Sequence, residues 1–136
     1  MKKFVCIIAL LTVNFCFSQS HPIDIKNRKC LENTMPTTLG GVKCEHAATA
    51  SWKKLMDSTL LQLKANPKQL SVTLLEASQK KWLEFQKFDL AFRASFYHIQ
   101  YQGGTMTMAA TAAHEKRQFR ERTLYLLELL ELFQEE

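Results

Sequence analysis

Apolar and aromatic residues recur every three or four positions along residues 68–101, and this spacing constrains the fold more than any other feature of the chain. The positions that follow it are Leu70, Leu74, Ser78, Trp82, Phe85, Asp89, Phe92 and Phe96. Such intervals place side chains on one face of an α-helix, whereas a strand requires alternation. The pattern predicts a helix over residues 68–101, which Gly103 and Gly104 end because glycine favours turns over helix interiors.

Two further segments have the same helical period. The first, over residues 42–65, ends at Asn66 and Pro67, because proline pushes the residue before it out of the α region. The second begins near Thr105, a residue type that caps helix N-termini, and continues to residue 136. Valine and isoleucine, which favour strands, are scarce after residue 18. We therefore predict an all-α fold, a three-helix antiparallel bundle over residues 42–136.

The segment over residues 19–41 has polar clusters, prolines and a glycine pair but no sustained apolar period, so we expect irregular chain. It contains Cys30, and Cys44 follows at the start of the first predicted helix. We predict a disulfide between these two cysteines. It would close a loop of about 15 residues, which corresponds to roughly 3 kcal/mol in the chain-entropy model.

The N-terminus reads as a cleavable secretory signal over residues 1–18. Lys2 and Lys3 precede an apolar run, and Cys16 and Ser18 flank Phe17 as the small residues of a cleavage site. The run is about half of the roughly 20 residues that span a membrane. We expect a periplasmic or secreted protein with no transmembrane segment in the mature chain.

Removal of the signal also changes the charge. It leaves 16 basic and 13 acidic residues, a net charge of +3 where the whole chain has +5. This modest excess lacks the clustered basicity of nucleic-acid binding proteins, so we expect no nucleic-acid partner.

Known catalytic motifs are absent from the sequence, and the four histidines, His21, His46, His98 and His114, are widely spaced. We predict no enzyme activity, no cofactor and no metal site. We expect a structural core that includes Trp52, Gln79, Trp82, Phe85, Asp89 and Arg122. A buried acid needs a partner, so Asp89 should pair with Arg122 or a tyrosine of another helix. A hydrolase remains an alternative if Asp89 and His114 meet in an open cleft.

The order of several short motifs resembles the secreted LprI-type lysozyme inhibitor family, over about residues 29–130. The residues that carry the resemblance are Cys30-Leu31, Thr37, Thr38, Cys44, Trp52, Leu63, Gln79, Trp82, Phe85, Gly103-Gly104-Thr105-Met106, Arg122 and Leu126. The chain departs from the family at Gln86 and Lys87, where members commonly have an arginine-aspartate pair. It also departs at Leu90 and His114, which stand where many members carry a second disulfide.

The resemblance implies a protein partner, with lysozyme as the leading candidate. We expect partner contacts at the turn Gly103, Gly104 and Thr105, and at the acidic residues Glu128 and Glu131, which would complement a basic lysozyme. The alternative is a structural or stress-related envelope module that binds another protein and has no effect on lysozyme. The oligomeric state stays open.

Overall fold

The computed structural model describes residues 20–34, 37–66 and 71–133, and these residues form four α-helices and no strand. The helices are α1 (Pro22–Asn33), α2 (Thr38–Lys64), α3 (Val72–Gln100) and α4 (Thr105–Leu132). The all-α prediction is confirmed, but the prediction of three helices is wrong because α1 adds a fourth. The predicted signal peptide, residues 1–18, lies outside the described residues.

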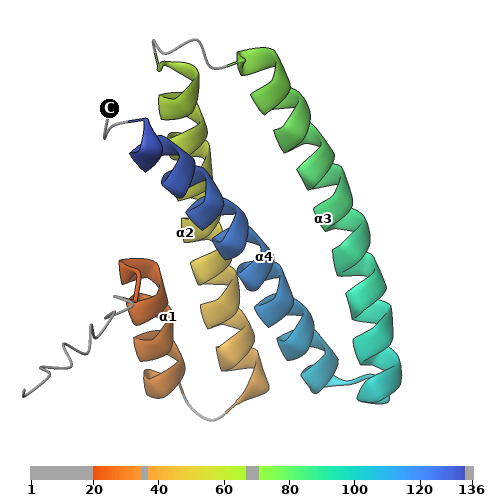
Figure 1. Ribbon diagram of the computed structural model, residues 1–136. Coiled ribbons are helices and arrows are strands. Elements are labelled where there is room, and N and C mark those ends of the chain that lie inside the picture. The colour runs from red at the N-terminus through yellow and green to blue at the C-terminus, as the bar shows by residue number, and fades with distance from the viewer. Residues whose placement is uncertain (1–19, 35–36, 67–70, 134–136) are drawn as a thin grey trace, which may run out of the picture.

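The three long helices run up, down and up, with α4 crossing along α2 (Figure 1). The α2–α4 interface is the most extensive in the molecule. Helix α1 packs on the first turns of α2, and α3 packs on α4. As a result α3 is attached mainly along one side, while α2 and α4 form the centre of the protein.

The main hydrophobic core lies between α2 and α4. Its buried members are Trp52, Met56, Leu60, Leu63, Phe119, Leu126 and Leu130. The hydroxyl of Thr123, fully buried beside them, donates a hydrogen bond to the Phe119 carbonyl oxygen (2.6 Å). Among the described residues, no helix combines the length and apolar character needed to cross a membrane.

Helix α1 overturns the expectation of irregular chain over residues 19–41. His21 caps the helix, because its Nδ1 accepts a hydrogen bond from the Ile23 amide (3.2 Å), and Pro22 takes the first turn, where no amide donor is needed. Asp24 adds a carboxylate to the positive end of the helix dipole. The prolyl residue that suggested a break therefore starts a helix, whose few apolar residues give no clear period.

Three contacts fix α1 against the bundle. The predicted disulfide joins Cys30 of α1 to Cys44 of α2, with their Cα atoms 5.8 Å apart. Asp24 forms an ion pair with Arg120 of α4 (2.8 Å). The buried amide of Asn27 lies 3.1 Å from the Cys44 carbonyl oxygen, to which it donates. Tertiary contacts thus stabilise a helix that its own sequence pattern does not predict.

Helix α2 begins at Thr38, four residues before the expected start at Val42. Thr37 is its cap, since its hydroxyl accepts a hydrogen bond from the Gly40 amide (3.2 Å). A Cβ atom on Gly40 would overlap the Thr34 hydroxyl, so glycine allows the end of α1 to approach α2 closely. The glycine pair thus lies within a helix and does not mark a break, and Gly40 serves packing.

The turn between α3 and α4 lies where the sequence predicts it. Gly103 donates its amide to the His98 carbonyl oxygen (2.9 Å), and Gln102, with φ of 53°, donates to Ile99 (3.4 Å). These two bonds form a Schellman motif, which satisfies the last carbonyls of a helix. Thr105 is the first residue of α4 and not its cap, a position that Gly104 takes without a side-chain hydrogen bond.

Candidate protein-interaction surface

The contact between α3 and the rest of the protein is largely polar. Gln79 and Gln86 are the buried residues of α3 within the described chain. Gln86 donates to the Gln118 side chain of α4 (3.4 Å). Trp82 is the main aromatic contribution, and its ring meets Phe119 edge-on with centroids 5.2 Å apart. The amide side chains of α3 therefore face the bundle, whereas most of its phenylalanines face away from it.

Asp89 finds a partner on α4, but not the one expected. Its Oδ2 accepts hydrogen bonds from His114 Nε2 (2.8 Å) and Gln118 Nε2 (2.6 Å). Neither Arg122 nor a tyrosine bonds to Asp89 among the described residues, so that part of the prediction is wrong. The helix geometry explains this, since Asp89 lies almost three turns along α3 from Gln79, where Arg122 binds.

The meeting of Asp89 and His114 bears on the hydrolase alternative. His114 is 6% exposed, and its second ring nitrogen, Nδ1, lies 2.8 Å from Arg117 Nη2. With Arg117 donating to Nδ1, the imidazole carries its proton on Nε2 and points it at Asp89. Both ring nitrogens are then occupied, so His114 has no free position from which to accept a proton from a substrate. The cluster joins α3 to α4, and Asp89 and His114 thus meet at a hollow that both of them line, with both ring nitrogens of His114 engaged.

Arg122 lies at the far end of this seam, half-buried between α3 and α4. Its Nε donates to the Gln79 side-chain oxygen (3.0 Å), and its guanidinium lies over the Trp82 ring, 5.6 Å from the centroid. Burial lowers the pKa of Arg122, and the nearby Tyr125 opposes this change. Its positive charge is compensated by neutral acceptors and aromatic faces, and no carboxylate of the described chain pairs with it.

Phe85 is 61% exposed, so its expected place in the core is wrong. The residues of α3 that face α4 include Gln79, Trp82 and Gln86, spaced by three and four. Phe85 lies roughly a quarter-turn or more away from the centre of that row at 100° per residue. Of the remaining expected core residues, Trp52 and Gln79 are buried, whereas Trp82, Asp89 and Arg122 are partly buried.

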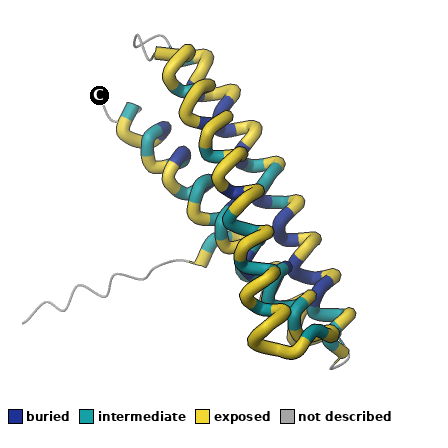
Figure 2. Tube along the Cα trace, turned by 90° about the vertical axis from the view of Figure 1, so that its right-hand side faces the viewer, coloured by how far each residue is buried: buried dark blue, intermediate teal, exposed yellow. Residues whose placement is uncertain are grey.

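A row of exposed apolar residues follows the outer side of α3, and we call it the α3 stripe. It consists of Phe85, Phe88, Phe92, Phe96 and Ile99, which are between 48% and 79% exposed. Seen from this side of the molecule, α3 is largely exposed (Figure 2). Its spacing of three, four, four and three keeps all five side chains on one face for about four turns.

The α3 stripe is uncharged as well as apolar. At 100° per residue, Lys87 and Arg93 lie about 100° or more from the centre of this face and project to other sides of the helix. A whole aromatic side chain has a surface of about 200 Å². At the exposed fractions of its five residues, the stripe therefore exposes roughly 600 Å² of apolar surface. This equals the upper end for the largest apolar patch of a typical monomer, about 300–600 Å², and such patches mark interaction sites.

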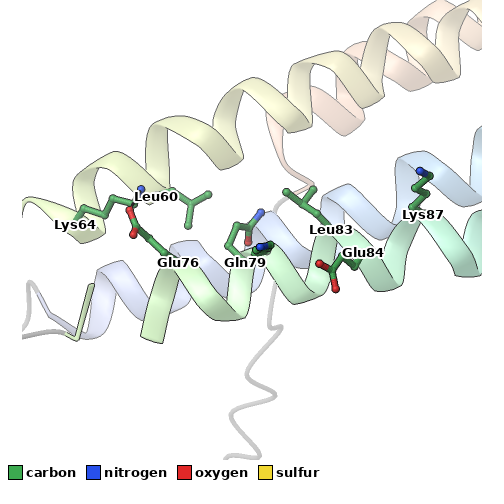
Figure 3. A pocket seen from close by; sticks show the side chains of 8 residues that line it. Leu60, Lys64, Glu76, Gln79, Leu83, Glu84 and Lys87 are labelled. Carbon is green, nitrogen blue, oxygen red and sulfur yellow. Dashed lines mark ion pairs between the residues drawn. The ribbon is translucent and has the colours of Figure 1, made fainter. Parts of the chain in front are cut away.

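A groove separates α3 from α2 on the other side of the helix (Figure 3). It has a cavity volume of about 530 Å³, with Leu60 of α2 and Leu83 of α3 on its walls. Lys64 of α2 and Glu76 of α3 point toward one another across one end and form an ion pair of 2.7 Å. The groove leaves α3 standing as a ridge, open along much of its length.

Lysine and glutamate side chains border this groove along α3. Lys81 donates a hydrogen bond to Glu84 (2.8 Å), and this bond lowers the pKa of the Glu84 carboxyl group, with the charge of Lys81 as the second cause. The groove side of the ridge is therefore charged, whereas Lys81 lies one turn before Phe85 on the face that the α3 stripe continues.

The structure separates the two sets of expected partner contacts. Gly103, Gly104 and Thr105 lie at the start of α4, next to the Ile99 end of the α3 stripe. Glu128 and Glu131 lie exposed near the opposite end of α4, about 35 and 39 Å from Thr105 at 1.5 Å per residue. The turn is therefore continuous with the α3 stripe, whereas the two glutamates are remote from it.

Comparison with known proteins identifies the family. The model of the lysozyme inhibitor LprI family matches residues 30–126, well over half of the chain. The chain belongs to the LprI lysozyme inhibitor family. Neither a curated protein nor a solved structure matches it. The LprI match begins at Cys30 and ends at Leu126, so it includes the disulfide, the α3 stripe and the α3–α4 turn.

Gln86 and His114, two of the positions where we expect this chain to depart from the family pattern, lie on the α3–α4 seam. His114, at one of the two expected positions of a second disulfide, forms the hydrogen bond to Asp89, which is adjacent to the other, Leu90. A polar contact thus joins the same two helices. Gln86 is buried in the seam, and Lys87 is exposed.

Sequence reasoning missed most of the residues of this surface. Phe88 and Ile99 were not selected, and Phe85, Phe92 and Phe96 were placed on the face expected to pack. The signal in the sequence is a helical face of aromatic residues without charges, for which no other predicted helix offers an apolar face of similar length. Such a face indicates a binding surface. The described residues include no group of three histidine, cysteine or acidic side chains positioned to hold a metal ion.

Proposed function

We propose that this LprI-family protein is exported and that it binds and inhibits a lysozyme-type muramidase through the α3 stripe. The family supports inhibition as the activity, and the N-terminal sequence supports export. The Cys30–Cys44 disulfide agrees with an oxidising compartment, periplasmic or extracellular. In this role the protein is a binding partner of an enzyme and not itself an enzyme.

The exposure of the α3 stripe is the observation that carries the proposal. The five large apolar residues form an open patch at the upper end of the range for a monomer, and their area of roughly 600 Å² approaches the ~800 Å² per partner of a standard interface. Central aromatic residues supply most of the binding free energy in such interfaces.

Shape and charge favour a muramidase cleft as that surface. Helix α3 is a ridge, and a cleft that accepts a sugar polymer is a matching concave surface with two carboxylic acids. Arg93 and Arg117 lie beside the stripe and would face those acids. The turn Gly103–Thr105 would contact the edge of the same partner.

The test is inhibition of lysozyme by purified residues 19–136 and by a stripe variant, Phe88→Ser with Phe92→Ser. We expect the wild-type protein to inhibit and the variant to need at least about tenfold more protein for the same effect, since two central aromatic residues are lost. The matched control is Leu39→Ser with Leu61→Ser, two equally exposed leucines on α2, which should inhibit like the wild type.

The same variants separate binding from stability. Phe88 and Phe92 are exposed, so their replacement should change the free energy of unfolding by no more than about 0.5 kcal/mol each. Wild-type protein without effect on lysozyme at low and moderate salt would contradict the proposal. If pull-downs with the wild-type protein, but not with the stripe variant, then recover a different envelope protein, the result would favour the alternative of an interaction module without effect on lysozyme.

A further inference from the structure

A hollow between α3 and α4 begins where the α3 stripe ends, and Phe85 belongs to both. Its cavity volume is about 380 Å³. Three arginines line it, Arg93 of α3 with Arg117 and Arg122 of α4, and we call it the arginine hollow. Trp82 adds an aromatic wall beside Phe85.

Arg93 lacks an acceptor within the described chain. Its Nε is buried and has no hydrogen-bond partner, and its guanidinium forms no ion pair with a described residue. Leaving a buried donor of a charged group without a partner is unfavourable. Arg93 nevertheless lines the hollow, so an anionic group bound there would compensate the charge of its guanidinium.

The other two arginines also lack carboxylate partners among the described residues. Arg117 donates to the neutral ring nitrogen of His114, and Arg122 donates to Gln79. Asp89 lines the hollow, but its Oδ2 already accepts from His114 and Gln118. The arginine hollow therefore presents guanidinium groups whose charges the protein itself leaves without direct ion pairs.

We propose that the arginine hollow receives one carboxylate side chain of the protein that covers the α3 stripe. A planar guanidinium matches the two oxygens of a carboxylate, and the match is shape-specific as well as electrostatic. With Asp89 and Glu121 on its walls against three arginines, the hollow has one positive charge in excess, which a single carboxylate neutralises. The inference rests on the proposed function, because the carboxylate belongs to the muramidase.

Two experiments on residues 19–136 test it, and the first needs no lysozyme. Sodium acetate is added at constant ionic strength while the Arg93 Nε–Hε signal is followed by nitrogen-edited NMR, with inorganic phosphate in a parallel series. We expect acetate to shift the Arg93 signal with saturation and to leave the Arg28 signal, an exposed α1 arginine, unchanged. No shift with acetate, or tighter binding of phosphate, would overturn the proposal.

The second experiment is the affinity for lysozyme of Arg93→Gln and Arg93→Lys. Loss of one partner of a desolvated charge pair should raise the dissociation constant of Arg93→Gln at least about tenfold. Arg93→Lys should recover part of that loss, since it keeps the charge without the planar fork. Arg28→Gln removes the same charge from α1 and should bind like the wild type.

The two results separate the two proposals. Lysozyme binding that Arg93→Gln leaves intact would overturn the carboxylate site and leave the inhibitor role standing. A saturating acetate shift in a protein that does not bind lysozyme would contradict the inhibitor role, while the arginine hollow would still be shown to bind a carboxylate.

Discussion

Single residues in this protein often have a role that differs from the usual one of their type. Gly40 lies inside a helix, although glycine usually ends one, because the Thr34 side chain occupies the space of a Cβ. Pro22 and His21 begin α1 as first-turn residue and cap. At Gly40 a contact with the end of the preceding helix decides the outcome, whereas His21 and Pro22 act through the local geometry of a helix start.

The role of Gly40 leads to a prediction with a neighbouring control. Gly40→Ala should destabilise the protein by about 1–3 kcal/mol, because the added methyl group forces α1 and α2 apart. At Gly41 the nearest atom to an added Cβ is on Leu31 at 3.9 Å, an ordinary contact. Gly41→Ala should therefore stabilise α2 by roughly 0.5–1 kcal/mol. Urea unfolding measures both changes, and equal effects of the two variants would contradict the packing role.

The sequence predicts the place of a residue well where a single helix determines its environment. It predicts that place poorly where two helices meet. Cys30 and Cys44 pair as expected, and Trp52 is buried as its helical period requires. The partner of Asp89 was not predictable, because it depends on how α4 rotates against α3. Phe85 was misplaced for the same reason, since a helical face shows which residues share a side but not what covers it.

At the level of elements, α1 depends on the disulfide more than the other helices do. It has few apolar residues of its own, and the Cys30–Cys44 bond joins it directly to α2. Its irregular appearance in the sequence and its helical state in the structure are thus compatible, since tertiary contacts provide most of the stability of a short helix.

Removal of this bond gives a second prediction. Cys30→Ser with Cys44→Ser should lower the free energy of unfolding by roughly 3 kcal/mol, the chain-entropy value for a loop of about 15 residues. The α3 stripe is remote from the disulfide, so at temperatures where the variant is folded its affinity for lysozyme should stay within about twofold of the wild type. Calorimetry and binding measurements check the two parts. A variant with unchanged stability would show that α1 is held by Asp24 and Asn27 instead.

Helix α3 is the element whose sequence and packing disagree most. Its amides and Asp89 meet α4, whereas its phenylalanines face outward, the reverse of the usual arrangement in an amphipathic helix. A sequence pattern predicts that α3 is a helix with an aromatic face. It cannot show that this face is left open, which is the property on which the proposed binding surface rests.

For the whole molecule, the distribution of charge matters more than its total. The net charge of the chain, +5 in full and +3 without the predicted signal, opposes approach to a basic lysozyme, and the acidic end of α4 is the local exception. Glu128 and Glu131 lie too far from the α3–α4 turn to contact the same small area of a partner. Their expected contribution is therefore to the rate of encounter.

This gives a third prediction, for Glu128→Gln with Glu131→Gln. The association rate with a basic lysozyme should fall roughly several-fold at low salt, and the difference should vanish at high salt, because charges at the rim act mainly through long-range steering. The dissociation rate should be unchanged. Stopped-flow or surface-binding kinetics measure both rates, and a faster dissociation would instead place these glutamates within the bound interface.

The central claim is that the α3 stripe is the surface through which the protein binds the enzyme. Amide hydrogen exchange of residues 19–136, measured free and in complex with lysozyme, tests it most directly because it reports protection along the whole chain. We predict new protection over residues 85–105 and little change in α1 and the first half of α2. A complex in which protection appears elsewhere and residues 85–99 exchange as in the free protein would contradict the account.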